Sequence, residues 1–271
     1  MKINHLDLFS GIGGFHLGFE RAGYEITSYF SEIDKHAVAV YKHQFPTSTY
    51  VGSVTDVRGA DLPNINLITF GSPCQDFSLA GKRKGMEGQR SSLILEAIRL
   101  ISECRPSVFV WENVKGTFSS NDGADFWAII QAFADIGGYR LEWQLLNTSW
   151  FLPQNRERIY LVGYSTTTGG DWDGVFPINQ RSRANNHKAR SESDTALTIT
   201  KRYYGAKSQG TYIGSSNEIR TMTEIECERL QGFPDNWTSC ISKPHRYETL
   251  GNAVTVDVVA AVAKKCLPLF N

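Results

Sequence analysis

The sequence predicts an α/β protein built on a parallel sheet with helices on both faces. Over residues 1–164, short apolar runs typical of buried strands alternate with amphipathic stretches of helical periodicity. A glycine-rich turn, GIGG at 11–14, separates the first apolar run from the first of these stretches. The composition changes after Tyr164, because residues 165–220 are rich in Thr, Ser, Gly, Asn and Arg. We therefore expect a regular α/β part followed by a small, loop-rich segment.

Each expected strand is a short apolar or β-branched run bounded by turn residues. In chain order these runs are 3–9, 24–30, 66–70, 107–111, 139–147 and 158–164. The expected helices have hydrophobic residues at helical spacing and start or stop signals at their ends. They are 11–23, 34–45, 91–104, 124–138 and about 254–266. Asp34 can cap the second of these helices, and TEIE at 223–226 has the spacing of a capping box.

Composition and charge narrow the class of protein. Hydrophobic residues make up 41% of the 271 positions and aromatic residues 12%, which excludes a disordered chain. Lys and Arg total 28, as do Asp and Glu, so the net charge gives no argument for a polyanionic partner. Charge is nevertheless unevenly distributed, with a net +5 over 180–207 and +3 over 82–90.

Cysteine usage and apolar runs indicate a soluble protein of a reducing compartment. The five cysteines include no C-x-x-C pair, which argues against a disulfide scaffold and a structural zinc site. Asp7 and Asp257 interrupt the two runs that could otherwise form a signal peptide or a membrane span. We therefore expect a cytoplasmic protein that holds no metal and binds no membrane.

The glycine-rich turn and the acid after the second strand suggest a nucleotide-like ligand. Glycines let a ligand approach the backbone closely where a helix begins. Gly11 and Gly13 fit the dinucleotide fingerprint G-x-G-x-x-G, but His16 occupies its third glycine position. Glu32 follows the second strand, where an acid can accept hydrogen bonds from ribose hydroxyls. The pattern favours an adenosine-bearing cofactor without a full pyrophosphate site; a simple tight turn and a solvated acid are the alternative.

Cys74 and Glu112 come at the ends of two buried strands. The carboxyl ends of parallel strands meet at one edge of a sheet, where α/β proteins bind ligands. Cys74 lies in GSPCQDFS, whose polar character favours a nucleophile over a core cysteine. A buried structural role suits Cys104, Cys227 and Cys266 better, because each lies in a helix-like segment. We therefore expect Cys74 to act as a thiolate, which is the reactive form of the side chain.

Three charged residues can complete a site around this thiol. Shielding by Trp111 would favour a protonated Glu112 that acts as an acid, with an ordinary strand-end acid as the alternative. Arg156 and Arg158 stand at i and i+2 where a strand begins, so both can point into one pocket. A solvated edge is the alternative for this pair.

Six segments stand in the order of the motifs of the DNA cytosine-5 methyltransferases, and the chain resembles that family over nearly its whole length. They are DLFSGIGG (7–14), GSPCQ (71–75), ENV (112–114), QNRERIYLVG (154–163), RTMTEIECERLQGFPDNW (220–237) and LGNAV (250–254). The resemblance implies a Rossmann-like S-adenosylmethionine-dependent methyltransferase sheet with a small, loop-rich target-recognition lobe. Residues 1–164 would then be the catalytic and cofactor-binding domain and 165–220 the target-recognition segment. Residues 221–271 would form a C-terminal segment whose last helix returns to the catalytic domain.

The resemblance implies S-adenosylmethionine as the methyl donor. The implied cofactor-binding residues are Phe9, Gly11, Ile12, Gly14, Glu32, Ile33, Val54 and Asn252. Within this set, Glu32 would hold the ribose hydroxyls and Ile33 would lie against the adenine. The sequence departs from the family at Ser53, where an Asp often contacts the adenine amino group. Asp56, three residues further on, is an open candidate for that contact.

The resemblance also implies a covalent mechanism. Cys74 would add to carbon 6 of cytosine, which makes carbon 5 a nucleophile toward the methyl group. Glu112 would bind and protonate N3, and Arg158, with Arg156, would hold the base carbonyl. A stacked base is out of reach of these groups, so the cytosine must be flipped out of the duplex.

The implied partner is double-stranded DNA, bound by a monomer. The implied DNA contacts are polar or basic residues of the two positively charged segments: Ser78, Lys82, Arg83, Arg181, Arg183, Lys201 and Arg202. A cognate restriction enzyme acting on the same site is a candidate companion in a restriction-modification system. Three other functions stay open: an RNA cytosine-5 methyltransferase, a catalytically inactive DNA-binding regulator, and a nicotinamide-dependent oxidoreductase. The last is disfavoured by His16 and leaves the P-C-Q motif without a role.

Overall fold

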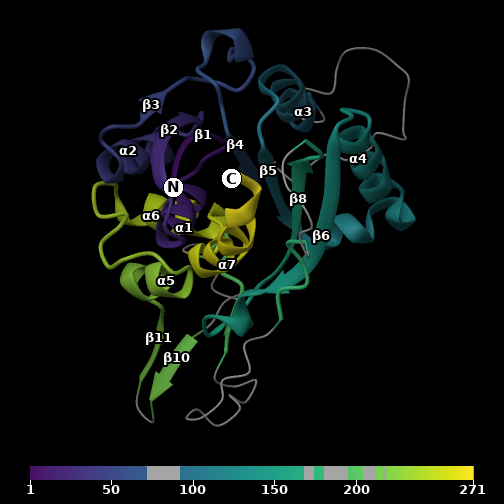
Figure 1. Ribbon diagram of the computed structural model, residues 1–271. Coiled ribbons are helices and arrows are strands. Elements are labelled where there is room, and N and C mark those ends of the chain that lie inside the picture. The colour runs from purple at the N-terminus through teal and green to yellow at the C-terminus, as the bar shows by residue number, and fades with distance from the viewer. Residues whose placement is uncertain (72–91, 168–173, 180–194, 204–211, 216–217, 271) are drawn as a thin grey trace.

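The computed structural model describes residues 1–71, 92–167, 174–179, 195–203, 212–215 and 218–270. Its centre is a seven-stranded sheet in the order β3-β2-β1-β4-β5-β8-β6 (Figure 1). These strands are β1 (Lys2–Leu8), β2 (Glu25–Ser31), β3 (Thr49–Tyr50), β4 (Leu67–Gly71), β5 (Val108–Val114), β6 (Tyr139–Asn147) and β8 (Glu157–Ser165).

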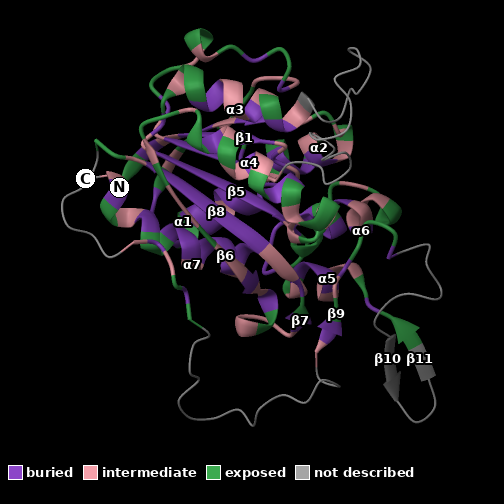
Figure 2. Ribbon diagram, turned by 90° about the vertical axis from the view of Figure 1, so that its right-hand side faces the viewer, coloured by how far each residue is buried: buried purple, intermediate pink, exposed green. Residues whose placement is uncertain are grey.

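Helices cover both faces of the sheet (Figure 2). On one face lie α1 (Gly14–Arg21) and α7 (Val256–Cys266), and on the other α3 (Ser92–Cys104) and α4 (Ala124–Ala134). Side chains along a strand alternate between the faces. Accordingly, Val108 and Val110 of β5 join the apolar cluster with α1 and α7, whereas Phe109 and Trp111 join the one with α3 and α4. The expected α/β fold with two covered faces is confirmed.

The expectation of an all-parallel sheet is wrong at one strand. β1, β2, β3, β4 and β5 pair in parallel, but β8 is antiparallel to both β5 and β6. The connection 148–156 between β6 and β8 is shorter than the dozen or more residues that a parallel crossover needs. The chain therefore turns back directly, and β8 enters the sheet between β5 and β6 in the opposite direction.

Local signals explain where the helices begin. α1 starts at Gly14 rather than at 11 because Gly11 and Gly13 have φ angles of 54° and 84°, outside the helical region. The Asp34 side chain caps α2 (Lys35–Gln44) by accepting hydrogen bonds from the N–H groups of His36 and Ala37. The capping box is present at α5 (Glu224–Leu230), where Thr223 and Glu226 bond to each other's backbone N–H groups. Both cap predictions are confirmed.

The end of the chain packs on its beginning. A Cβ atom at Gly18 of α1 would collide with Val259 of α7, so glycine permits the close approach of these two helices. The Tyr24 hydroxyl donates to the Ala263 carbonyl at 3.0 Å across the same contact. α6 (Lys243–Asn252) precedes α7 and ends at the LGNAV segment. No helix within the described ranges is both long and apolar enough to cross a bilayer.

The described parts of 165–220 contain little regular structure. β9 (Ala196–Leu197) pairs with β7 (Gln154–Asn155), and β10 (Tyr212–Ser215) forms an antiparallel pair with β11 (Glu218–Thr221). Figure 1 shows β10 and β11 projecting away from the central sheet, below α5.

Candidate active site

The glycine-rich turn joins the ends of β1 and β2. The Ser10 N–H donates to the Ser31 carbonyl at 3.1 Å, and Phe9 takes a positive φ of 51°, which is uncommon for a residue with a side chain. A Cβ at Gly14 would lie 2.6 Å from Cγ2 of Val254. The LGNAV segment therefore closes the turn at Gly14, whereas a Cβ at Gly11 would meet no atom within 4 Å, so the turn is open at that glycine.

Backbone N–H groups fix the carboxylate of Glu32 beside this turn. One oxygen accepts from Gly11 at 2.9 Å, and the other accepts from Ile33 at 2.8 Å and from Asp34 at 2.9 Å. The neighbouring Ile33 side chain is 79% exposed. An oriented acceptor therefore lies next to an uncovered apolar side chain, which suits a ligand that carries both hydroxyl groups and a flat apolar ring.

Three other expected cofactor residues differ in their accessibility. Ile12 and Val54 are 1% and 3% exposed, so their side chains belong to the core. The Ile12 carbonyl accepts a hydrogen bond from the Trp237 indole N–H at 3.0 Å. Asn252, by contrast, is exposed at the end of α6. Asp56 is exposed too, and its N–H closes a turn onto the Ser53 carbonyl at 2.9 Å.

Glu112 lies inside β5, which continues to Val114 instead of ending at Trp111. In the sheet register it stands opposite Gly71 of β4 on one side and Tyr160 of β8 on the other. A Cβ at Gly71 would lie 3.3 Å from a carboxylate oxygen of Glu112. Gly71 is the last described residue before 72–91, so Cys74 itself lies outside the described residues. The sheet nonetheless brings Glu112 next to the strand end from which Cys74 follows.

A buried ion pair joins Glu112 to Arg158. The Arg158 Nε lies 3.1 Å from a Glu112 oxygen, and the two side chains are 16% and 11% exposed. Burial raises the pKa of Glu112 above its ordinary value, although Arg158 and Arg156 oppose that shift. Burial likewise raises the pKa of the facing Tyr160, with Glu112 adding to that shift. The site therefore favours a carboxyl that keeps its proton more readily than a solvated one.

Arg156 is directed mainly toward backbone carbonyls. It is 3% exposed and donates to Ile199 at 3.0 Å, Gly251 at 3.3 Å and Ala253 at 2.8 Å. It thereby fastens β9 and the LGNAV segment to the start of β8. The expectation of a shared face with Arg158 is met only in part, because Arg156 lies just outside β8, between β7 and β8. Its contribution to holding the base stays a prediction.

Sequence reasoning missed a buried polar network beneath the turn. The Asp7 carboxylate accepts from the Thr69 hydroxyl at 2.8 Å and from the Tyr41 hydroxyl at 3.4 Å. The Thr69 hydroxyl also contacts His5 Nε2 at 2.7 Å, and the Tyr41 hydroxyl contacts His16 Nδ1 at 3.0 Å. The available signal was the presence of His5 and Asp7 in an otherwise apolar strand, INHLDLF. Polar residues at buried strand positions need partners, which predicts such a network.

Few of the expected DNA contacts fall on described residues. Ser78, Lys82, Arg83, Arg181 and Arg183 lie outside them. Lys201 and Arg202 are exposed in the turn after β9. This turn lies against the LGNAV segment, since a Cβ at Gly251 would collide with the backbone of Thr200 and Lys201.

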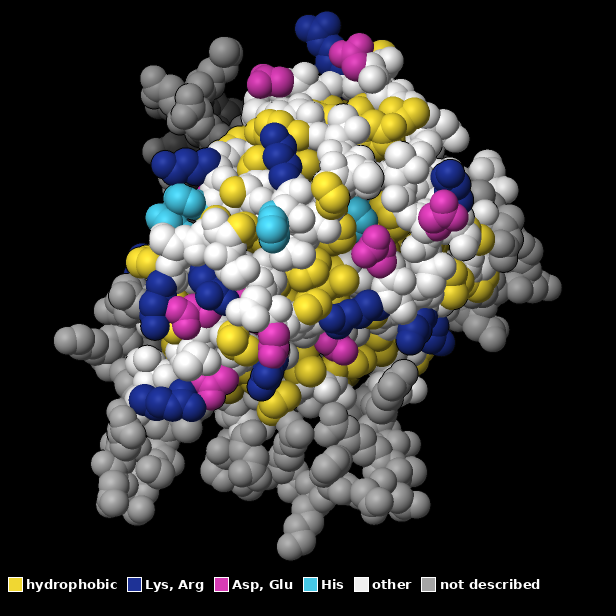
Figure 3. All heavy atoms as spheres, turned by 90° about the vertical axis from the view of Figure 1, so that its left-hand side faces the viewer, with side chains coloured by type: hydrophobic (Ala, Val, Ile, Leu, Met, Phe, Trp, Pro, Cys, Tyr) yellow, Lys and Arg dark blue, Asp and Glu magenta, His cyan; other side chains and the backbone are white. Residues whose placement is uncertain are grey.

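Charge elsewhere on the described surface is mixed. On the face drawn in Figure 3, Lys and Arg side chains are interspersed with Asp and Glu, and no large area carries a single sign among the described residues. Nor do the described residues include a group of three or more His, Cys, Asp or Glu side chains that could hold a metal ion.

The profile of the family "C-5 cytosine-specific DNA methylase" matches residues 3–198 and 165–268. The chain belongs to this family. It is therefore a DNA cytosine-5 methyltransferase, and the expected Rossmann-like methyltransferase fold is confirmed.

Individual members of the family are similar to this chain over nearly its whole length. The Type II methyltransferase M.NlaX of Neisseria lactamica is 34% identical, with 96% of this chain and 95% of that protein covered. The Type II methyltransferase M1.ScrFI of Lactococcus lactis subsp. cremoris is 32% identical, with 100% and 79% covered. Among solved structures, the Dnmt2 methyltransferase of S. pombe superposes with a TM-score of 0.78 at 21% identity, covering 98% of this chain and 99% of that one. This last likeness supports the fold.

Proposed function

We propose that this methyltransferase transfers a methyl group from S-adenosylmethionine to carbon 5 of a flipped-out cytosine in a specific double-stranded DNA sequence, through a covalent Cys74–cytosine intermediate. One observation carries the proposal. The buried Glu112–Arg158 pair lies beside Gly71, three residues before Cys74, at the strand ends that also carry the glycine turn. The acid and the proposed cofactor turn therefore lie at the same edge of the sheet, and the segment that carries Cys74 follows the neighbouring strand end at Gly71.

The residues of the turn fit S-adenosylmethionine. A carboxylate has about four lone-pair sites, and Glu32 uses three of them on backbone N–H groups, so it can still accept from a ribose hydroxyl. The exposed Ile33 offers an apolar surface for the adenine. Phe9 and Gly11 are the partly exposed residues of the turn, and we assign Ile12, Gly14, Val54 and Asn252 to the same cofactor site. When bound, the cofactor supplies an electrophilic methyl group on a sulfonium.

The base would be activated by addition and protonation. The Cys74 thiolate forms a bond to carbon 6 while N3 takes a proton from Glu112, and carbon 5 becomes an enamine-like nucleophile. Burial raises the pKa of Glu112 above its ordinary value, which favours the protonated carboxyl that this step needs. Arg158 balances the carboxylate that remains, and Arg156 holds the surrounding backbone. After methyl transfer, the carbon 5 proton passes to solvent water, the Cys74 thiolate leaves carbon 6, and N3 returns its proton to the Glu112 carboxylate, which restores the neutral ring.

DNA recognition would depend on the segment 165–220 and the basic stretch 82–90. The first carries Arg181, Arg183, Lys201 and Arg202, side-chain types that pair with base edges or phosphates. The second, with Lys82 and Arg83, follows Cys74 and Ser78 directly and could close over the target phosphates. Extruding the base costs a few kcal/mol, which contacts of this kind would offset.

The cellular setting of the enzyme is part of the same proposal. Several relatives at 30% identity or more are named Type II methyltransferases, which supports a companion restriction enzyme and a cytoplasmic location. The M.SPRI protein of Bacillus phage SPR, 40% identical over 60% of this chain, is named an orphan methyltransferase. We propose a monomer that acts within a restriction-modification system.

A mechanism-based trap tests the covalent step. DNA with 5-fluorocytosine at the target cannot lose fluorine as a proton, so the wild-type enzyme should form a stable adduct on Cys74, found by peptide mapping. Cys74→Ser should give none while still binding S-adenosylmethionine. An active enzyme whose adduct forms on another residue, or not at all, would remove Cys74 from the mechanism. Methylation-sensitive sequencing of DNA from expressing cells identifies the target site, and an RNA substrate in the same trap tests the RNA alternative.

A further inference from the structure

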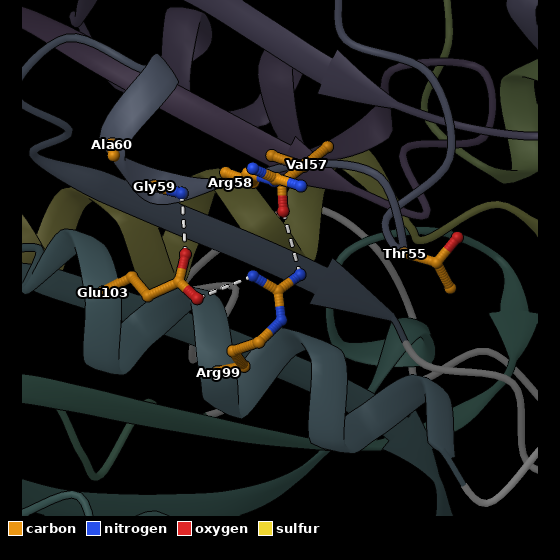
Figure 4. A pocket seen from close by; sticks show the side chains of 7 residues that line it. All are labelled: Thr55, Val57, Arg58, Gly59, Ala60, Arg99 and Glu103. Atoms are coloured by element: carbon orange, nitrogen blue, oxygen red, sulfur yellow. Dashed lines mark hydrogen bonds and ion pairs between the residues drawn. The ribbon is translucent and has the colours of Figure 1, made fainter.

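A charged cluster on α3 holds the loop that follows β3 (Figure 4). Arg99 donates from Nη2 to the carbonyl of Val57 at 2.9 Å and to that of Val54 at 3.3 Å. Its Nε and Nη1 donate to Glu96 and Glu103, each at 2.8 Å. The other oxygen of Glu103 accepts from the Gly59 N–H at 2.7 Å. Three backbone groups of one loop are therefore fixed by a single helix.

The contacts of Glu103 favour its charged form. The hydrogen bond from the Gly59 N–H, and then the contact with Arg99, lower the pKa of Glu103. Two carboxylates of the same helix therefore hold the guanidinium in one orientation, on the side of a surface hollow that Thr55 and Arg58 also line. A planar guanidinium oriented in this way can donate to two carbonyls at once, which an ammonium group does less well.

The loop needs such support because it lacks regular structure. Between β3 and the short 3₁₀ helix Gly59–Asp61, its backbone forms only isolated turns, such as the one that closes at Asp56. The Val54 and Val57 side chains are 3% and 5% exposed and pack in the apolar cluster that includes Ile101 of α3. Apolar packing buries these two side chains, but the hydrophobic effect is non-directional and does not by itself orient the backbone carbonyls. Hydrogen bonds to the two carbonyls supply that orientation.

We propose that Arg99 is a positioning residue for S-adenosylmethionine: it sets the backbone of Val54, and thereby the wall of the adenine site. This inference rests on the proposed function, which places Val54 at the cofactor. Arg99 lies behind the loop and touches no part of the proposed substrate, so it acts through Val54. α3 begins directly after the segment that carries Cys74. The same helix therefore contacts the cofactor loop through Arg99 and continues the chain from the nucleophile segment.

Two substitutions of Arg99 test this role. Arg99→Gln removes both the positive charge and the planar guanidinium group. Arg99→Lys keeps the charge but cannot donate to the two carbonyls and the two carboxylates in the same geometry. In calorimetry without DNA, Arg99→Gln should bind S-adenosylmethionine about tenfold more weakly, the effect of losing one or two hydrogen bonds. Arg99→Lys should fall between Arg99→Gln and the wild type. With saturating cofactor, kcat should stay within about twofold of wild type, while KM for the cofactor rises in parallel with Kd.

Arg105→Gln is the matched control. Arg105 follows α3 and likewise donates to two backbone carbonyls, Ile136 at 3.0 Å and Gly137 at 3.1 Å, but on a loop away from Val54. Both Gln variants should lower the Tm, and only Arg99→Gln should weaken cofactor binding. If Arg99→Gln and Arg99→Lys bind the cofactor as wild type does, Arg99 is merely structural and the inference is wrong. If the wild type binds no S-adenosylmethionine, or if Glu32→Ala leaves binding unchanged, the proposed cofactor site itself is wrong.

Discussion

The cofactor half and the base half of the candidate site are held in place by different kinds of contact. In the cofactor half, backbone N–H groups of Gly11, Ile33 and Asp34 orient the Glu32 carboxylate. In the base half, Glu112 is oriented by the side chain of Arg158 within buried strands. Backbone donors do not titrate, whereas a buried ion pair depends on the charge of both partners. Substitutions in the first half should therefore change binding, and substitutions in the second should change chemistry.

The largest effect is expected from Glu112→Gln. Glutamine keeps the shape of the side chain but cannot transfer a proton, and general acid–base groups typically contribute about 10²–10⁴-fold. The kcat for methyl transfer should fall by that factor, measured with radiolabelled cofactor and target DNA. Since burial raises the pKa of Glu112, the wild-type rate should decline as pH rises through that pKa, and the variant should lack this decline.

Cofactor binding controls for the integrity of the Glu112→Gln protein. The variant should bind S-adenosylmethionine with the wild-type Kd, because Glu112 lies in the base half. If the variant keeps most of its turnover, Glu112 does not act as a general acid and has only a structural role. A variant that loses cofactor binding would show that the two halves are not independent.

A smaller effect, on the other half, is expected from Glu32→Ala. Hydrogen bonds to a charged group contribute about 1.5–3 kcal/mol, so S-adenosylmethionine should bind about 10–100-fold more weakly in calorimetry without DNA. At saturating cofactor the kcat should stay close to wild type. A reduced kcat with an unchanged Kd would reverse the assignment of Glu32 and remove the distinction between the halves.

The sequence predicts the arrangement around the glycine turn because each of its signals is local. A glycine turn after a strand, an acid after the next strand and the Asp34 cap are each defined by a few neighbouring residues, and the structure brings them together. The antiparallel β8 was missed, because alternating apolar runs indicate strands but not their direction. The short connection 148–156 was the available signal.

Contacts made by long side chains across the fold could not be read from the sequence. Glu96, Arg99 and Glu103 have helical spacing and look like an ordinary solvated surface. Their second set of contacts, to a loop more than 40 residues earlier, follows only from tertiary packing. Arg156 is similar, since sequence spacing paired it with Arg158 while the fold directs it to carbonyls far along the chain.

The smallest effect concerns Asp7, a buried carboxyl in the polar network beneath the cofactor half. Burial raises the pKa of Asp7 well above its ordinary value, and the hydrogen bonds from Thr69 and Tyr41 only partly oppose this. A carboxyl with a raised pKa binds protons more strongly in the folded state than in the unfolded state. The free energy of unfolding should therefore fall as pH rises from about 4 to the folded pKa, and then level off.

Asp7→Asn removes this titration while keeping a side chain of similar size. The stability of the variant relative to wild type should increase with pH across the same window, by about 1.4 kcal/mol per unit of raised pKa, measured by urea unfolding at successive pH values. Asp61→Asn, at an exposed position, controls for the loss of an Asp as such. The kcat at saturating cofactor should not change. A stability difference that is flat with pH would show that Asp7 is ionised in the fold, and a large loss of kcat would show that the network beneath the turn reaches the base half.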